Sequence, residues 1–234
     1  LSGFNRSQVS YIINRIDRTI ESKTSLQDEY RMLGFKQWTN LGGSLAEVRR
    51  IAEIVPGTDT LTGRNVTETA IKKMSDNQEL ANYKAIHFST HGMAVPDIPR
   101  LSAIVLSQLS DSALQGIEDG YMRMDEIALL DLKADFVNLS ACETGLGKIY
   151  SSEGVVNLAH SFMAAGANGV SVSLWEVADR STAKFMIEVY RLVEEEKYGY
   201  VRAISEVKRR FITGKYSGSW TRPFFWAPFV YYGL

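Results

Sequence analysis

Two stretches of the sequence place reactive side chains directly after apolar runs. The only cysteine, Cys142, follows the run 136–140 and precedes a loop with two glycines. His91 ends a similar run, 86–90, and is followed by Gly92. The two residues are 51 positions apart, since 142 − 91 = 51. A single cysteine with a histidine elsewhere in the chain predicts a nucleophile and its base.

This pair has the chemistry for cleavage of an acyl bond. A free thiol, with a pKa near about 8.5, is mostly protonated at neutral pH. An imidazole beside Cys142 would take the thiol proton and later protonate the leaving amine. Backbone N–H groups of Gly92 and Cys142 that point at one spot would stabilise the oxyanion. The alternative for Cys142 is a small buried hydrophobic residue.

The remaining candidates for chemistry form weaker patterns. His87 lies inside an apolar run and is expected to be a satisfied residue of a sheet face, and His160 falls within a predicted helix. Neither shows a metal-site spacing with a carboxylate or with Cys142. Gly145 and Gly147 lack the third glycine and the lysine of phosphate-binding loops. We therefore predict no metal, no cofactor and, without a basic patch, no nucleic acid contacted directly.

Composition favours one large globular domain. The 234 residues are 45% hydrophobic and 23% charged, with a net charge of −1 that implies no charged partner. One cysteine excludes an internal disulfide, and no run approaches the roughly 18 apolar residues of a membrane helix. We expect a cytoplasmic protein without membrane contact. Because the chain starts at Leu1, without methionine, we expect a further N-terminal region.

The first 40 residues are predicted to be helical. Over 8–33 apolar residues recur at helical spacing, with charged residues between them. This amphipathic helix either packs on the core or forms the end of an upstream helical regulatory domain. The next helix is predicted to be capped by Ser44 and to end before the Pro-Gly pair at 56–57.

Further along the chain, strands alternate with helices. Strands are predicted at 59–61, 84–90, 101–106, 136–140 and 169–175, and helices from Thr67, over 125–132, after 151 or 152, and twice near the C-terminus. Residues 92–100, with two prolines, are predicted to be a loop, and Asp119-Gly120 predicts a turn.

This alternation predicts an α/β fold, with a mainly parallel sheet flanked by helices on both faces. Ligands of such sheets bind at the carboxyl ends of the strands. Both His91 and Cys142 come just after a predicted strand, so we expect them on the same rim.

Four motifs resemble the CHAT domains, caspase-like domains found beside tetratricopeptide repeats and related at greater distance to caspases and separases. The motifs are His-Phe-Ser-Thr-His-Gly at 87–92, Leu-Ser-Ala-Cys-Glu-Thr-Gly at 139–145, the stretch 164–179 and Phe-Trp-Ala-Pro-Phe-Val at 225–230. The resemblance implies a caspase-like fold. It also implies two parts, an N-terminal helical segment at 1–40 and a caspase-like peptidase domain at 41–234.

The resemblance implies a cysteine endopeptidase with His91 and Cys142 as the catalytic dyad and the amides of Gly92 and Cys142 as the oxyanion site. Its partners would be a protein substrate and an upstream or separate regulatory region, such as tetratricopeptide repeats. Ser-Ala-Cys-Glu-Thr-Gly at 140–145 departs from the caspase motif Gln-Ala-Cys-x-Gly, so specificity for aspartate does not carry over. A catalytically silent, caspase-like interaction module is the alternative, and the presence of both dyad residues favours the peptidase.

Residues 175–179 resemble the part of the family's fold that walls the specificity pocket. Trp175, Glu176 and Asp179 are therefore predicted to contact the substrate, and an acidic side chain there would favour a basic residue before the scissile bond. Asp179 is also suited to cap a helix that begins near Arg180. The two roles are compatible.

Overall fold

The computed structural model describes residues 6–21, 26–35, 38, 40–95, 98–108, 119–140, 153–175, 177 and 179–233. Within these residues, the centre of the fold is a sheet with the strand order β1-β5-β6-β7. The strands are β1 (Ala85–Phe88), β5 (Phe136–Leu139), β6 (Gly169–Ser173) and β7 (Phe229–Gly233). The first three are parallel and β7 is antiparallel to β6, which confirms the mainly parallel α/β fold.

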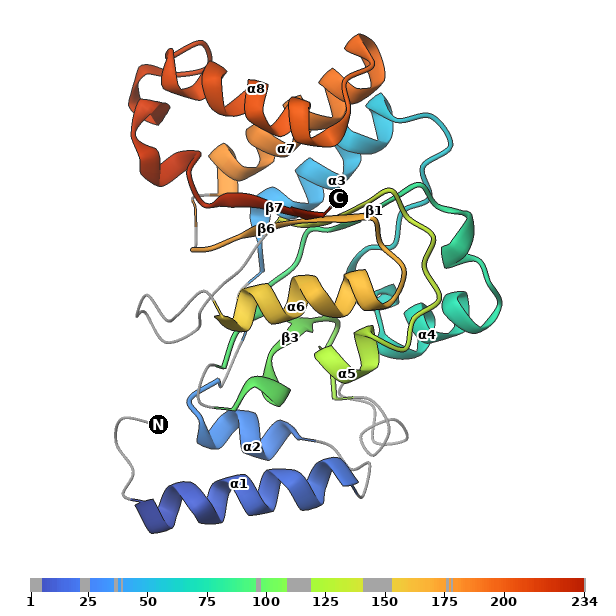
Figure 1. Ribbon diagram of the computed structural model, residues 1–234, viewed down its shortest axis with the longest axis vertical. Helices are drawn as coiled ribbons and strands as arrows, with labels where there is room; N and C mark the ends of the chain where they lie inside the picture. Colours follow the sequence, from blue (N-terminus) through green and yellow to red (C-terminus); the bar gives the residue numbers. More distant parts are fainter. Residues whose placement is uncertain are drawn as a thin grey trace.

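Helices cover both faces of this sheet, as predicted (Figure 1). On one face lie α3 (Gly42–Ile54), α7 (Asp179–Glu196) and α8 (Tyr200–Ile212); on the other lie α4 (Glu68–Asp76), α5 (Met124–Ile127) and α6 (Glu153–Ala164). Alternate residues of β5 supply the two cores, since Phe136 packs with α7 whereas Val137 packs with α6. No helix in the described part of the chain is long and apolar enough to span a membrane.

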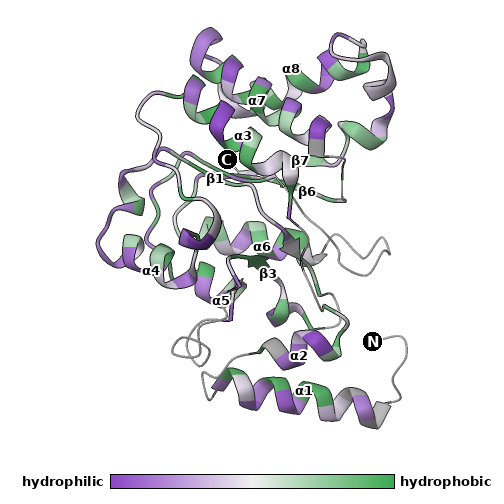
Figure 2. Cartoon of the chain, turned by 180° about the vertical axis from the view of Figure 1, so that it is seen from behind, coloured by the Kyte–Doolittle hydropathy of each residue, from purple (hydrophilic) through white to green (hydrophobic). Residues whose placement is uncertain are grey.

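A second, antiparallel sheet lies beyond α6 and has the order β2-β3-β4. Its strands are β2 (Gly92–Met93), β3 (Ala103–Val105) and β4 (Tyr121–Arg123). One face, with Ile104 and Met122, joins the core under α6. The other face packs on α1 (Arg6–Glu21) and α2 (Gln27–Met32). Figure 2 shows the hydrophobic β3 between α6 and α2.

The N-terminal helical region differs from its prediction. Instead of one helix over 8–33, the chain forms α1 and α2, and Leu26 directly before α2 is not helical. Leu26 is 0% exposed, and its N–H donates to the Asp119 carboxylate at 3.1 Å. This long-range bond takes a backbone donor that a continuous helix would use internally. Both helices pack on the second sheet, and the division into 1–40 and 41–234 stays a prediction.

Other differences are local. The predicted strand at 59–61 is irregular and exposed, because no neighbouring strand pairs with it in the described residues. Ser44 does not cap α3, which begins at Gly42 after Leu41. The predicted loop 92–100 contains β2, and the predicted helix 125–132 is the short α5. Short 3₁₀ turns lie at Gly63–Asn65, Leu80–Asn82, Pro99–Leu101, Gly218–Thr221 and Pro223–Phe225.

Several local signals are confirmed. Thr67 caps α4, since its hydroxyl oxygen accepts from the Ala70 N–H at 3.1 Å. Gly120 has a φ of 79°, in the left-handed region that favours glycine, at the turn that leads into β4. The strands predicted at 84–90, 136–140 and 169–175 are β1, β5 and β6. The strand predicted at 101–106 is β3, which belongs to the second sheet.

His87 is the satisfied sheet-face residue that the sequence predicts. Its Nε2 lies 2.8 Å from Oε1 of Glu47, a buried residue of α3. Its Nδ1 accepts from the Asn138 amide at 3.2 Å and from the Tyr190 hydroxyl at 3.3 Å. Because Nδ1 is an acceptor, Nε2–H is the donor to Glu47. The cluster of Glu47, His87, Asn138 and Tyr190 links α3 and α7 to the strands β1 and β5.

This cluster predicts a loss of stability when His87 is replaced. We expect His87→Phe to lower the free energy of unfolding by about 3 kcal/mol, because the Glu47 carboxylate would stay buried without its donor. Urea denaturation measures the change. The control is His160→Phe, which replaces an exposed histidine of α6 and should alter stability by no more than about 0.5 kcal/mol. Equal losses in the two variants would contradict this role.

Candidate active site

The carboxyl ends of β1 and β5 lie side by side. The strands pair in parallel, with Phe88 opposite Leu139. The Ser140 N–H donates to the Phe88 carbonyl at 3.0 Å, and the Ser140 hydroxyl donates to that of Ser89 at 3.3 Å. The two segments that carry His91 and Cys142 therefore leave the sheet at one rim. Cys142 itself, two residues past Ser140, lies outside the described residues.

His91 stands where the chain passes from the central sheet into the second sheet. Its carbonyl accepts from the Val105 N–H at 2.8 Å. The Thr90 hydroxyl donates to the Val105 carbonyl, and Gly92 pairs with Ile104 as the first residue of β2. These contacts with β3 fix the backbone on both sides of His91. Gly92 is buried there, and its part in an oxyanion site stays a prediction.

The ring of His91 is buried against an aromatic side chain from the N-terminal segment. His91 is 6% exposed, and the centre of its ring lies 5.0 Å from that of Trp38, with 39° between the planes. The indole N–H of Trp38 donates to the Tyr121 hydroxyl at 3.1 Å. The sequence carries no signal for Trp38, because this residue follows the predicted helix without a motif and lies 53 positions before His91, since 91 − 38 = 53.

The predicted substrate-contacting residues follow β6, at the same rim. The Trp175 indole donates to the Phe224 carbonyl at 3.1 Å, and the Trp175 carbonyl accepts from the Ser173 hydroxyl at 2.7 Å. Trp175 is therefore held between the end of β6 and the segment before β7. Glu176 lies outside the described residues, as does the side chain of Asp179, the first residue of α7. The pocket and the helix cap both stay predictions.

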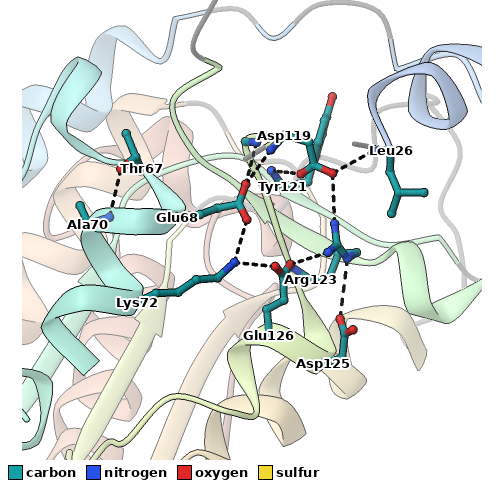
Figure 3. A network of polar contacts seen from close by, with 11 residues as sticks. Leu26, Thr67, Glu68, Ala70, Lys72, Asp119, Tyr121, Arg123, Asp125 and Glu126 are labelled. Carbon is teal, nitrogen blue, oxygen red and sulfur yellow. Dashed lines mark hydrogen bonds and ion pairs between the residues drawn. The ribbon is translucent and has the colours of Figure 1, made fainter. Parts of the chain in front are cut away.

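A largely buried network of charged side chains lies beside the second sheet (Figure 3). Glu68 accepts from the backbone N–H groups of Asp119 and Gly120, at 3.0 and 2.8 Å. Lys72 bridges Glu68 and Glu126, at 3.1 and 2.7 Å.

Arg123 completes the network on the other side of Glu126. Its guanidinium lies 3.1 Å from a carboxylate oxygen of Glu126 and 3.1 Å from one of Asp119. Asp119 also accepts from the N–H groups of Leu26, at 3.1 Å, and Tyr121, at 3.0 Å. The network thus joins α4 to β4 and to the start of α2.

Burial raises the pKa of two carboxyl groups in this network, those of Glu68 and Asp119. Desolvation, reinforced by the charges of Asp119 and Glu126, raises the pKa of Glu68 to about 7, against the opposing effect of Lys72. Desolvation also raises the pKa of Asp119 above its usual range, although Arg123 opposes the shift. Sequence reasoning did not find this network, because its charged residues come from separate segments and show no common spacing.

Comparisons with known proteins agree with the motifs. The family model of the CHAT domain matches residues 14–234. The match includes part of α1 and all of α2, so it extends further toward the N-terminus than the peptidase domain at 41–234 that the resemblance implies. A comparison with curated proteins gives no match.

The network predicts a pH dependence of stability that Glu68 causes. The ordinary pKa of a glutamate carboxyl is 4.5, whereas that of Glu68 in the folded chain is about 7. Between these values the folded state binds more protons, so the stabilising contribution is complete below 4.5 and is lost as the pH rises through 7. We expect the melting temperature of the unchanged chain to fall as the pH rises from about 5 to 7.5, and that of Glu68→Gln to fall less over the same range.

The matched control for this measurement is Glu206→Gln. Arg210 and Arg209 lower the pKa of the Glu206 carboxyl, so this partly exposed residue of α8 titrates below the range and should leave the slope unchanged. A slope that is identical in Glu68→Gln and in the unchanged chain would show that Glu68 is not the group responsible.

Proposed function

This chain belongs to the CHAT domain family, and we propose that it is a regulated cysteine endopeptidase with His91 and Cys142 as its dyad. The family is caspase-like and related to peptidases. The observation that carries the proposal is the parallel pairing of β1 with β5, in which the Ser140 N–H bonds to the Phe88 carbonyl at 3.0 Å. Because of this pairing, the segments that lead to His91 and Cys142 begin at neighbouring positions on the rim.

The proposed reaction has two steps. His91 takes the proton of the Cys142 thiol, and the thiolate attacks the carbonyl carbon of the peptide bond. The amides of Gly92 and Cys142 stabilise the oxyanion. The intermediate then expels the amine, which His91 protonates, and leaves a thioester. Water, with its proton taken by His91, hydrolyses the thioester, and the proton returns to the thiolate.

The proposed substrate is a protein that is cut after a basic residue. The Glu176 and Asp179 carboxylates, beside Trp175, would pair with a guanidinium or ammonium group and reject an acidic one. We further propose that cleavage takes place in the cytoplasm and that an upstream or separate region, such as tetratricopeptide repeats, switches it on. The alternative is a catalytically silent interaction module, in which the buried His91 would be a packing residue.

Removal of either dyad residue tests the proposed chemistry. We expect Cys142→Ala to lower the rate of peptide cleavage by at least about a thousandfold, and His91→Ala to do nearly the same, because the two act as one unit. The rates are measured on a fluorogenic peptide panel, and folding is checked by thermal unfolding. Residual cleavage in Cys142→Ala, together with a loss of several kcal/mol of stability, would identify the cysteine as a packing residue.

Specificity is tested on the same panel, with arginine, lysine, leucine or aspartate before the cleaved bond. We expect the basic peptides to be cut fastest and Asp179→Ala to reduce that preference by about tenfold or more, because a charge-assisted pair is lost. Faster cleavage of the aspartyl peptide would show that the pocket assignment is wrong. An unchanged basic preference in Asp179→Ala would mean that another residue supplies the charge.

A further inference from the structure

We propose that Trp38 is a positioning residue for His91: its indole holds the imidazole in the orientation that accepts the thiol proton. The inference rests on the proposed function, since it assigns a role relative to the His91–Cys142 dyad. It extends that function to the N-terminal segment, which contains none of the four motifs.

The contact restricts the imidazole. The ring centres lie 5.0 Å apart with 39° between the planes, so the indole lies over one side of the imidazole. The His91 backbone is held by β3, so the remaining freedom is rotation of the side chain. Rotation toward Trp38 would push the imidazole into the indole.

Trp38 is itself anchored by other aromatic side chains. Its ring stacks on Phe35 at 6.0 Å, and its N–H donates to the Tyr121 hydroxyl at 3.1 Å. The ring centres of Tyr121 and Tyr30 lie 3.9 Å apart, and the Tyr30 hydroxyl donates to the Leu101 carbonyl at 3.0 Å. These side chains belong to the core beneath the second sheet. An indole held by several contacts is suited to a fixed position beside His91 and not to a lid that opens and closes.

The charged network strengthens this anchor. Asp119 accepts from the N–H groups of both Leu26 and Tyr121. The same carboxylate therefore fixes the segment that leads to Trp38 and the residue that accepts its hydrogen bond.

The reactivity of the single cysteine provides the test. Because Cys142 is the only thiol, the rate of alkylation by iodoacetamide at pH 6.5 reports on that residue alone. The full chain is compared with His91→Ala, Trp38→Leu and Trp38→Phe. We expect Trp38→Leu to react about three- to tenfold more slowly than the unchanged chain. Trp38→Phe keeps a ring over the imidazole and should recover most of the rate, which a loss of folding alone would not produce.

Two further variants complete the experiment. Trp220→Leu removes a tryptophan that stacks on Phe211 of α8 and should leave the rate unchanged. Tyr121→Phe removes the acceptor of the indole N–H but keeps the rings, and should react about two- to threefold more slowly. If Trp38→Leu does not fold, the alkylation rate of Tyr121→Phe tests the positioning role of Trp38 instead.

The outcomes separate the two proposals. An unchanged rate in Trp38→Leu, or in Tyr121→Phe where that variant decides, overturns the positioning role, and a faster rate shows that the indole covers the site instead. If the unchanged chain and His91→Ala both react at the rate of an ordinary thiol, the dyad itself fails. If alkylation depends on His91 but not on Trp38, the proposed function stands and the further inference falls.

Discussion

The parallel pairing of β1 with β5 determines where the segments that carry His91 and Cys142 leave the central sheet. Its register places Phe88 beside Leu139 and brings the segments after both strands to one rim. The sheet can hold this register because its two faces are covered by separate cores, one under α6 and one under α7. A slip by one residue would exchange the faces of Phe136 and Val137 and would break both cores. The cores thereby fix where the candidate dyad begins.

The second sheet and its charged network determine what surrounds His91. The network places the carboxylates of Glu68, Asp119 and Glu126 around Lys72 and Arg123. Desolvation raises the pKa of Glu68 to about 7 despite Lys72, so burial outweighs attraction at that carboxyl. Such a network contributes little net stability. Its hydrogen bonds are directional, however, and they hold β4 and the start of α2 in one arrangement.

The sequence predicted the parts of the fold that local patterns encode. Apolar runs located β1, β5 and β6, and their alternation with helices indicated the covered, mainly parallel sheet. The same reasoning distinguished His87, inside a strand, from His91, just after it. The prediction of one helix over 8–33 was wrong because a residue distant in the sequence determines the local structure. The chain is not helical at Leu26, whose N–H bonds to Asp119, 93 positions away. The contact between Trp38 and His91 has no sequence signal for the same reason. Cys142, Glu176 and the side chain of Asp179 lie outside the described residues.

We propose that the pairing of β1 with β5 brings His91 to Cys142. The most direct measurement is the separation between the His91 ring nitrogens and the Cys142 sulfur in a crystal structure of the chain with a reduced thiol. We predict direct contact or contact through one water, within about 5 Å. A separation beyond about 8 Å, with the His91 ring still against Trp38 and no segment able to close the gap, would contradict it.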